Sequence, residues 1–198
     1  MKESLKKHIR QYIEISDDQL EKYCSAFRIE NIKKKDFLLK EGEICEEEGF
    51  VLKGCFKVFR TDKNSDDQIL YFAVEDWWIS DIDSFINKIP SQLNIQAIED
   101  SEILLISREN KEKLYQEIPE IERLMRLKFQ MSIIALQRRI IDNLSKPSDE
   151  RYQDFLRDYP KTAHRLTNIQ IAAYLGVTPE FISRIRRKIV SKNQEGNF

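Results

Sequence analysis

The sequence predicts an α+β protein in three parts: N-terminal helices with a barrel or roll of short strands, one long helix, and a C-terminal helix-turn-helix domain. Three observations support this prediction. Short aromatic and aliphatic runs alternate with turn residues between positions 37 and 107. Apolar residues then follow helical spacing from Pro119 to Leu144, and two short helical segments flank Gly176. The expected divisions of the 198 residues are 1–117, 118–145 and 146–198.

Composition places the chain among globular proteins, with 41% hydrophobic and 34% charged residues. No apolar run approaches the roughly 20 residues of a membrane span, and the N-terminus lacks the apolar region of a secretory signal. We therefore expect a cytoplasmic protein with no membrane partner. Cys24, Cys45 and Cys55 form no CxxC pair, which predicts reduced thiols, no metal and no cofactor.

The N-terminal region carries apolar residues at helical spacing and is expected to be helical up to Asp36. Ser16, before Asp17 and Asp18, suits an N-cap followed by an acidic first turn. Short strands are expected next, separated by turn residues. They cover residues 37–40, 50–60, 68–73, 77–80, 93–99 and 103–107.

The long helix is expected to begin at Pro119, a residue that suits a first helical turn. It carries two apolar stripes. One contains Leu124, Leu127, Met131, Ile134 and Ile141, and the other contains Ile121, Met125, Phe129, Ile133, Leu136, Ile140 and Leu144. One stripe is enough to pack the helix on its own domain. A second copy of the chain is the natural partner of the other stripe, and burial under the C-terminal domain is the alternative.

The segment from Thr167 to about Val190 predicts two helices joined by a tight turn. Thr167 and Gln170 form a capping box, Gly176 suits the left-handed turn, and Thr178 caps a second helix that Pro179 opens. Small Ala172 allows the helices to approach closely. The side chains expected to face inward from the second helix are Phe181, Ile182, Ile185 and Ile189.

Charge on the second helix points to double-stranded DNA as a partner. The chain has net charge -1, but ten Lys and Arg face six Asp and Glu from Lys146 onward. Arg184 is expected to bind guanine, and Glu180 to accept a hydrogen bond from cytosine. Thr178, Arg187 and Lys188 are expected on phosphates, with Ser183 free on the same face. A solvated basic helix is the alternative interpretation.

These features resemble the CRP/FNR family of bacterial regulators over nearly the whole chain. The resemblance rests on Glu41-Gly42-Glu43, on residues 50–54, on residues 77–81 and on Gly176 to Ile185. It implies a cyclic-nucleotide-binding-type β-roll, a long dimerisation helix and a C-terminal winged helix-turn-helix in a homodimer. Glu180 and Arg184 match the family's base-contacting pair, while Pro179 replaces another base-reading arginine. The end of the chain at Phe198 leaves little room for the wing.

The effector pocket departs from the family pattern. Cyclic-nucleotide binders use a Gly-Glu pair and, about ten residues later, an arginine that pairs with the cyclic phosphate. The aligned residues here are Ser80 and Asp81, and no arginine lies near residues 90–93. Losing such a partner costs about 2 to 5 kcal/mol, so the pocket is not expected to respond to cAMP. Its candidate residues are Trp78, Ser80, Asp81, Ser91 and Gln137.

Two other classes of function compare with DNA binding. An enzyme is not expected, because neither His8 nor His164 lies in a nucleophile or metal motif and no glycine-rich phosphate loop is present. A protein-interaction module is the main alternative, in which the β-roll binds a peptide or ligand and the basic helix docks on an acidic surface. The remaining expected partners are RNA polymerase and an unidentified small-molecule effector.

Overall fold

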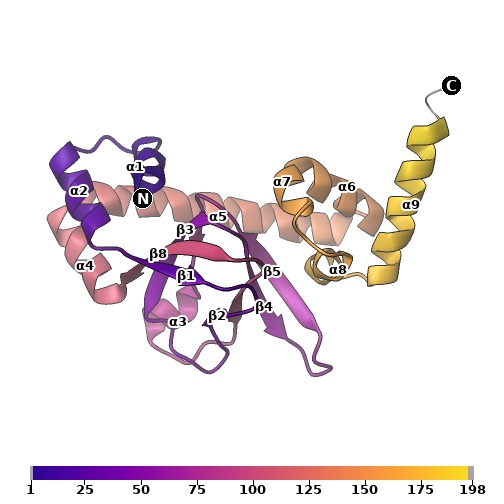
Figure 1. The fold of residues 1–198 in the computed structure, drawn as a ribbon, viewed down its shortest axis with the longest axis horizontal. Helices are drawn as coiled ribbons and strands as arrows, with labels where there is room; N and C mark the ends of the chain where they lie inside the picture. The colour runs from indigo at the N-terminus through magenta and orange to yellow at the C-terminus, as the bar shows by residue number, and fades with distance from the viewer. Residues whose placement is uncertain (1, 196–198) are drawn as a thin grey trace. The chain divides into compact units, whose positions relative to one another are not determined.

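The computed structural model describes residues 2–195, with side chains described through Lys188. In the described residues, two helices come first, strands and a short helix follow, and six helices come after the last strand (Figure 1). The helices are α1 (Glu3–Arg10), α2 (Asp17–Ser25), α3 (Ile82–Asn87), α4 (Arg108–Glu117), α5 (Pro119–Ser145), α6 (Ser148–Asp158), α7 (Pro160–Ala163), α8 (Asn168–Leu175) and α9 (Pro179–Glu195). The strands are β1 (Arg28–Ile32), β2 (Phe37–Leu39), β3 (Glu47–Lys53), β4 (Phe56–Thr61), β5 (Asp67–Ala73), β6 (Trp78–Ile79), β7 (Asn94–Ala97) and β8 (Ser101–Ser107).

The strands form two four-stranded sheets, in the orders β1-β8-β3-β6 and β2-β7-β4-β5. Alternation along β3 and β8 sends neighbouring side chains to opposite faces of the first sheet. Val51 and Ile103 enter an interior cluster with residues of the second sheet, such as Phe56 and Ile95. The expected roll of short strands in an α+β fold is confirmed.

The outer face of the first sheet is covered by helices. Phe50 and Leu104 point from β3 and β8 into a helix-facing cluster to which α1, α2, α4 and the start of α5 contribute. The N-cap expected at Ser16 is present and belongs to a capping box, because its side chain accepts from Gln19 N and the Gln19 side chain accepts from Ser16 N. Ser16 thus fixes where α2 begins. Tyr23, further along this helix, packs in the helix-facing cluster.

The expectation of a helical region up to Asp36 is wrong for β1. α2 ends at Ser25, and Arg28 to Ile32 pair antiparallel with β8, in register from Arg28 opposite Leu105 to Ile32 opposite Ser101. Ile29 and Ile32 have a spacing that also fits a helix. In a strand this odd spacing sends Ile29 to the helix-facing cluster and Ile32 to the interior cluster. The segment expected as one strand over 50–60 is two strands, β3 and β4.

The long helix α5 begins at Pro119 as expected and is buried only near its start. Ile121, Leu124 and Met125 are at most 3% exposed. Beyond residue 130, members of both predicted stripes are between 46% and 84% exposed: Met131, Ile133, Ile134, Leu136, Ile140, Ile141 and Leu144. The second half of α5 therefore leaves a long apolar surface uncovered in the single chain.

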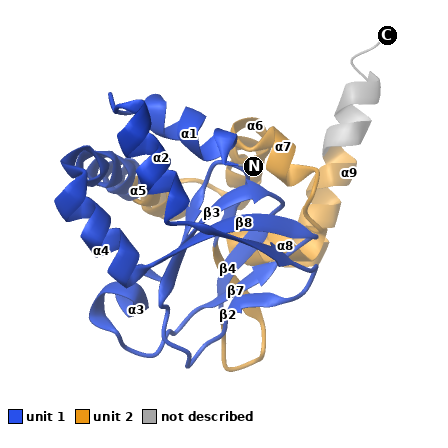
Figure 2. Ribbon diagram, turned by 60° about the vertical axis from the view of Figure 1, so that its left-hand side comes forward, with its two compact units in different colours: residues 1–60, 71–134 blue, residues 61–70, 135–198 orange. Residues whose placement is uncertain are grey.

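The chain divides into two compact units (Figure 2). The first contains residues 1–60 and 71–134, and the second contains residues 61–70 and 135–198. The boundary falls inside α5, and the expected three-part division stays a prediction. No helix among the described residues is long and apolar enough to cross a membrane.

Candidate nucleic-acid interface

The turn between α8 and α9 is built as its sequence predicts. Thr167 Oγ1 accepts from Gln170 N at 3.2 Å, and the Gln170 side chain accepts from Thr167 N at 2.8 Å. At the other end of α8, Gly176 adopts φ 67° and ψ 40°, a left-handed conformation that glycine takes at little cost. Thr178 then caps α9 by accepting from Phe181 N at 3.2 Å. These contacts set the direction in which α9 leaves the turn.

The two helices share the apolar core that the sequence predicts. The residues of this core are at most 7% exposed: Ile171, Ala172, Leu175, Ile182 and Ile185. Phe181, expected to face inward, is only half-buried, and the side chain of Ile189 lies outside the described residues. Arg186 also fastens α9 to α6, because its Nε donates to Tyr152 Oη at 2.8 Å.

One face of α9 and its cap remains exposed and polar. Five of the six candidate DNA contacts are exposed: Thr178, Glu180, Arg184, Arg187 and Lys188. They begin at the helix cap and recur at the spacing of one helical face. The chemistry of this face suits nucleic acid, since it offers cations for phosphates and a guanidinium and a carboxylate for base edges.

The sixth candidate, Ser183, is not the free side chain that the sequence suggested. Its hydroxyl donates to Pro179 O at 3.0 Å and accepts from Asn168 Nδ2 at 3.2 Å. Serine in a helix often bonds back to the preceding turn in this way. Because Asn168 lies in the first turn of α8, Ser183 joins the two helices, and we count it as part of the support for the exposed face.

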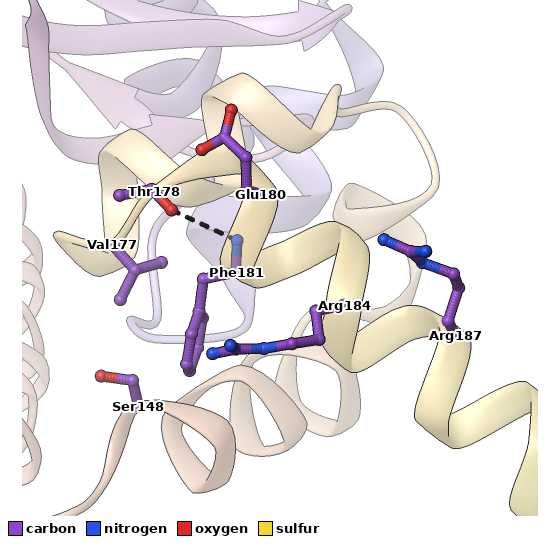
Figure 3. Close-up of a pocket in the computed structure, with 7 residues that line it drawn as sticks. All are labelled: Ser148, Val177, Thr178, Glu180, Phe181, Arg184 and Arg187. Atoms are coloured by element: carbon purple, nitrogen blue, oxygen red, sulfur yellow. Dashed lines mark hydrogen bonds between the residues drawn. The ribbon is translucent and has the colours of Figure 1, made fainter.

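An open pocket of about 410 Å³ lies beside the start of α9. It is lined by Ser148, Val177, Thr178, Glu180, Phe181, Arg184 and Arg187. Figure 3 shows the Phe181 ring and the Arg184 guanidinium extending side by side towards Ser148, while Glu180 points away from them. Ser148 and Val177 were not among the candidate residues, because a helix start and a turn position give no sign of a shared pocket in the sequence.

Two arginines hold the carbonyl end of α8 just before the turn. Arg139 Nη2 donates to Tyr174 O at 2.7 Å, and Arg151 Nη1 donates to Leu175 O at 2.9 Å. Arg139 also donates to the carbonyls of Ile69 and Leu70, and it lies 4.1 Å from the centroid of the Tyr174 ring. Burial lowers the pKa of Arg139 from its ordinary value. Cations suit this end of a helix, where the dipole is negative.

The candidate effector residues Ser80, Asp81 and Ser91 come together in the first unit. All three are buried, and Asp81 Oδ2 accepts from Ser91 Oγ at 2.6 Å. The other oxygen of Asp81 accepts from the backbone of Asp83 at 3.1 Å and of Ser84 at 3.4 Å, so it caps α3. The backbone amides at this turn are thus occupied by a carboxylate of the chain itself.

These residues differ in charge from a phosphate site. A bound phosphate is stabilised by a cation and by free amides, whereas this position presents the buried carboxylate of Asp81. The nearby guanidinium of Arg108 donates to the carbonyls of Cys45 and Phe85 instead. The backbone carbonyl of Ser80 accepts from Tyr71 Oη at 3.2 Å.

Trp78 does not join this group, contrary to the sequence expectation. Trp78 lies opposite Phe50 in the β3–β6 pair, and their ring centroids are 5.2 Å apart. It therefore packs on the helix-facing cluster, while the next residue, Ile79, enters the interior cluster. Gln137 is exposed on α5 and belongs to the second unit, and its part in the effector pocket stays a prediction. Trp77, which precedes Trp78 in the chain, is 39% exposed.

Comparison with protein families finds a match for the part of the chain that contains the strands. The model of the cyclic nucleotide-binding domain matches residues 29–117, which run from β1 to the end of α4. No curated protein sequence matches the chain. The family match thus covers the strands, α3 and α4, and leaves α5 to α9 to be compared by structure.

Solved structures match most of the chain at low sequence identity. The c-di-GMP-responsive global regulator CLP of Xanthomonas campestris is 13% identical with a TM-score of 0.75, over 90% of this chain and 93% of the other. FixK2 of Bradyrhizobium japonicum is 18% identical with a TM-score of 0.75, over 84% and 86%. A CRP/FNR-family regulator from Eubacterium rectale is 16% identical with a TM-score of 0.69, over 90% and 85%. The chain therefore has the fold of the CRP/FNR transcription regulators, and its residues 29–117 match the cyclic nucleotide-binding domain.

Proposed function

We propose that the chain is a sequence-specific DNA-binding transcription regulator in which α8 and α9 form the helix-turn-helix. The observation that supports this most is the exposed face of α9, where Glu180, Arg184 and Lys188 lie beyond a fully buried core. In such motifs the second helix enters the major groove and its first turns contact base edges. Arg184 binds guanine O6 and N7, and Glu180 accepts from cytosine N4.

The remaining cations position the protein on the duplex. Thr178, Arg187 and Lys188 contact phosphates, which contribute affinity without sequence information. Arg139 and Arg151 support the motif, because they donate hydrogen bonds to backbone carbonyls at the end of α8 that precedes the turn. Ser183 keeps α8 and α9 together through Asn168. The base-reading side chains therefore project from a helix that these contacts hold in position.

The regulator acts as a homodimer joined along α5. The exposed apolar side chains between Met131 and Leu144 support this, because a row of isoleucines and leucines on one helix is costly to leave in water. Two copies packed along α5 cover this surface in a two-fold arrangement. A dimer of this kind reads two half-sites about one turn of DNA apart.

The effector, if one acts on the β-roll, is of a class other than cAMP or cGMP. This proposal rests on the carboxylate of Asp81, which is buried and hydrogen-bonded at the position where a cyclic phosphate requires a cation. The phosphate would bring a second negative charge into a poorly solvated site, where like charges repel strongly.

Selection of duplexes from a random DNA library tests the function. The full chain should enrich one site with two inverted half-sites and bind it about a thousandfold more tightly than random duplex at physiological salt. Equal binding to the enriched and the scrambled duplex would contradict sequence-specific binding and would show only a basic surface that binds any DNA. Binding to an acidic protein without any preferred duplex would instead favour an interaction module.

A further inference from the structure

Phe181 is an aromatic residue in the first turn of α9 that the core of its unit does not bury. Along the helix, Ile182 is 0% exposed and Ile185 is 7% exposed, whereas Phe181 is half-buried. Its ring lines the open pocket beside Val177 (Figure 3). The fold therefore leaves apolar ring surface at the edge of the face that carries the candidate DNA contacts.

The ring is held in place relative to the helix and to Arg184. The backbone of Phe181 is fixed by its hydrogen bond to Thr178 Oγ1, and the adjoining Ile182 is anchored in the core. The guanidinium carbon of Arg184, one turn further on, lies 5.3 Å from the ring centroid. This is the range of a cation–π contact. The Phe181 ring and the Arg184 guanidinium therefore form one continuous surface that a partner can contact.

The major groove offers a matching pair of groups. Guanine presents the acceptors O6 and N7, and thymine presents its C5 methyl group, which packs on apolar side chains such as phenylalanine. Neighbouring bases in one strand are about 3.4 Å apart along the axis. A ring 5.3 Å from a guanidinium that binds guanine is thus placed to reach the adjoining base.

We propose that Phe181 reads the methyl group of a thymine next to the guanine that Arg184 binds. This inference rests on the DNA binding proposed above and adds a second specificity-determining residue to it. The apolar ring packs on the thymine methyl group, and Arg184 binds O6 and N7 of the neighbouring guanine. A half-site should then contain a thymine and a guanine as neighbours.

Replacing thymine by uracil in the selected duplex tests this proposal, because the exchange removes one methyl group and keeps the base pair and the sugar. At the thymine beside the Arg184-bound guanine, the wild-type chain should lose about three- to fivefold in affinity per half-site, the value of one buried methyl group. Phe181→Ala should bind the thymine and uracil duplexes equally. Phe181→Leu, which keeps an apolar side chain, should retain part of the discrimination.

Ile169→Ala is the matched control, because Ile169 is a 68% exposed apolar residue of α8, in the same unit. This variant should keep the full thymine-to-uracil ratio. The proposal is overturned if the wild-type chain binds its selected site specifically but tolerates uracil at every position, which would leave the DNA-binding function intact. It is also overturned if Phe181→Ala keeps the wild-type ratio, or if no thymine adjoins the guanine in the selected half-site. Failure to select any site at all would instead contradict the function itself.

Discussion

The Asp81 carboxylate accepts a hydrogen bond of 2.6 Å from the Ser91 hydroxyl, and both side chains are buried. We therefore expect cAMP and cGMP at millimolar concentration to leave the melting temperature unchanged, because only a ligand of the native state raises it. Thermal unfolding with 5′-AMP as the control measures this. A calorimetric dissociation constant below about 10 µM, or roughly -7 kcal/mol, would show that the pocket holds the phosphate in another way.

His8 should make the protein less stable in mild acid. It is 6% exposed and packs against the rings of Phe50 and Tyr12, and burial lowers its pKa from 6.5 to about 4. Between these two pH values the unfolded chain binds a proton that the folded chain does not. Stability is therefore lost as the pH falls from about 6.5 to about 4, by about 3 kcal/mol in all.

Urea unfolding at pH 7 and pH 4.5 measures this loss. His8→Phe should reduce the difference in unfolding free energy between the two pH values, because the aromatic ring stays and the titrating group is removed. His164→Gln is the control, since His164 is exposed. Identical pH dependence in the wild-type chain and in His8→Phe would show that His8 does not cause the acid sensitivity.

The proposed dimer should depend on the exposed isoleucines of α5. Ile134 and Ile141 are 46% and 60% exposed in the single chain and lie seven residues apart on one stripe. Replacing both by aspartate places charges in an apolar seam, which should yield monomers at micromolar concentration in sedimentation. Ser132→Asp adds a charge at an exposed polar position of the same helix and should leave a dimer. A wild-type monomer, or an unchanged mass for the double variant, would contradict a dimer joined along the apolar surface of α5.

Arg139 should stabilise the second unit through contacts that its neighbour Arg138 does not make. Removing its hydrogen bonds to Tyr174 O, Ile69 O and Leu70 O in Arg139→Ala should lower the unfolding free energy by about 1 to 3 kcal/mol. Arg138→Ala, at an exposed position, should change it by less than about 0.5 kcal/mol. Arg139→Lys should not restore the loss, because an ammonium lacks the planar fork that reaches several carbonyls. Equal effects of the two alanine variants in urea unfolding would contradict this role.

The local signals in the sequence predicted the parts of the fold that depend on neighbouring residues. Ser16 caps α2, Thr167 forms its capping box, Pro119 opens α5, and Gly176 turns left-handed, because each feature is decided within a few residues. The strand β1 was missed because its pairing with β8 is a contact between residues about 70 positions apart, which no local pattern contains.

The site was predicted in part for the same reason. Helix periodicity placed Glu180, Arg184 and Lys188 on the exposed face, but it gave no sign that Asn168 would engage Ser183 from another helix. Trp78 shows the same limit. Its place in a short strand does not determine which face of the sheet its side chain lies on, and the pairing with Phe50 puts it on the face that the helices cover. The contact of Arg139 with the carbonyl end of α8 depends on tertiary structure alone.

The most direct test of the account separates base reading from phosphate binding on α9. Binding isotherms at several salt concentrations, on the selected duplex and a scrambled one, should be recorded for Arg184→Ala and Lys188→Ala. Arg184→Ala should lose about 1 to 3 kcal/mol on the selected duplex and little on the scrambled one. Lys188→Ala should weaken both equally and reduce the log-log salt slope by about one. Identical behaviour of the two variants on both duplexes would contradict the assignment of Arg184 to base reading.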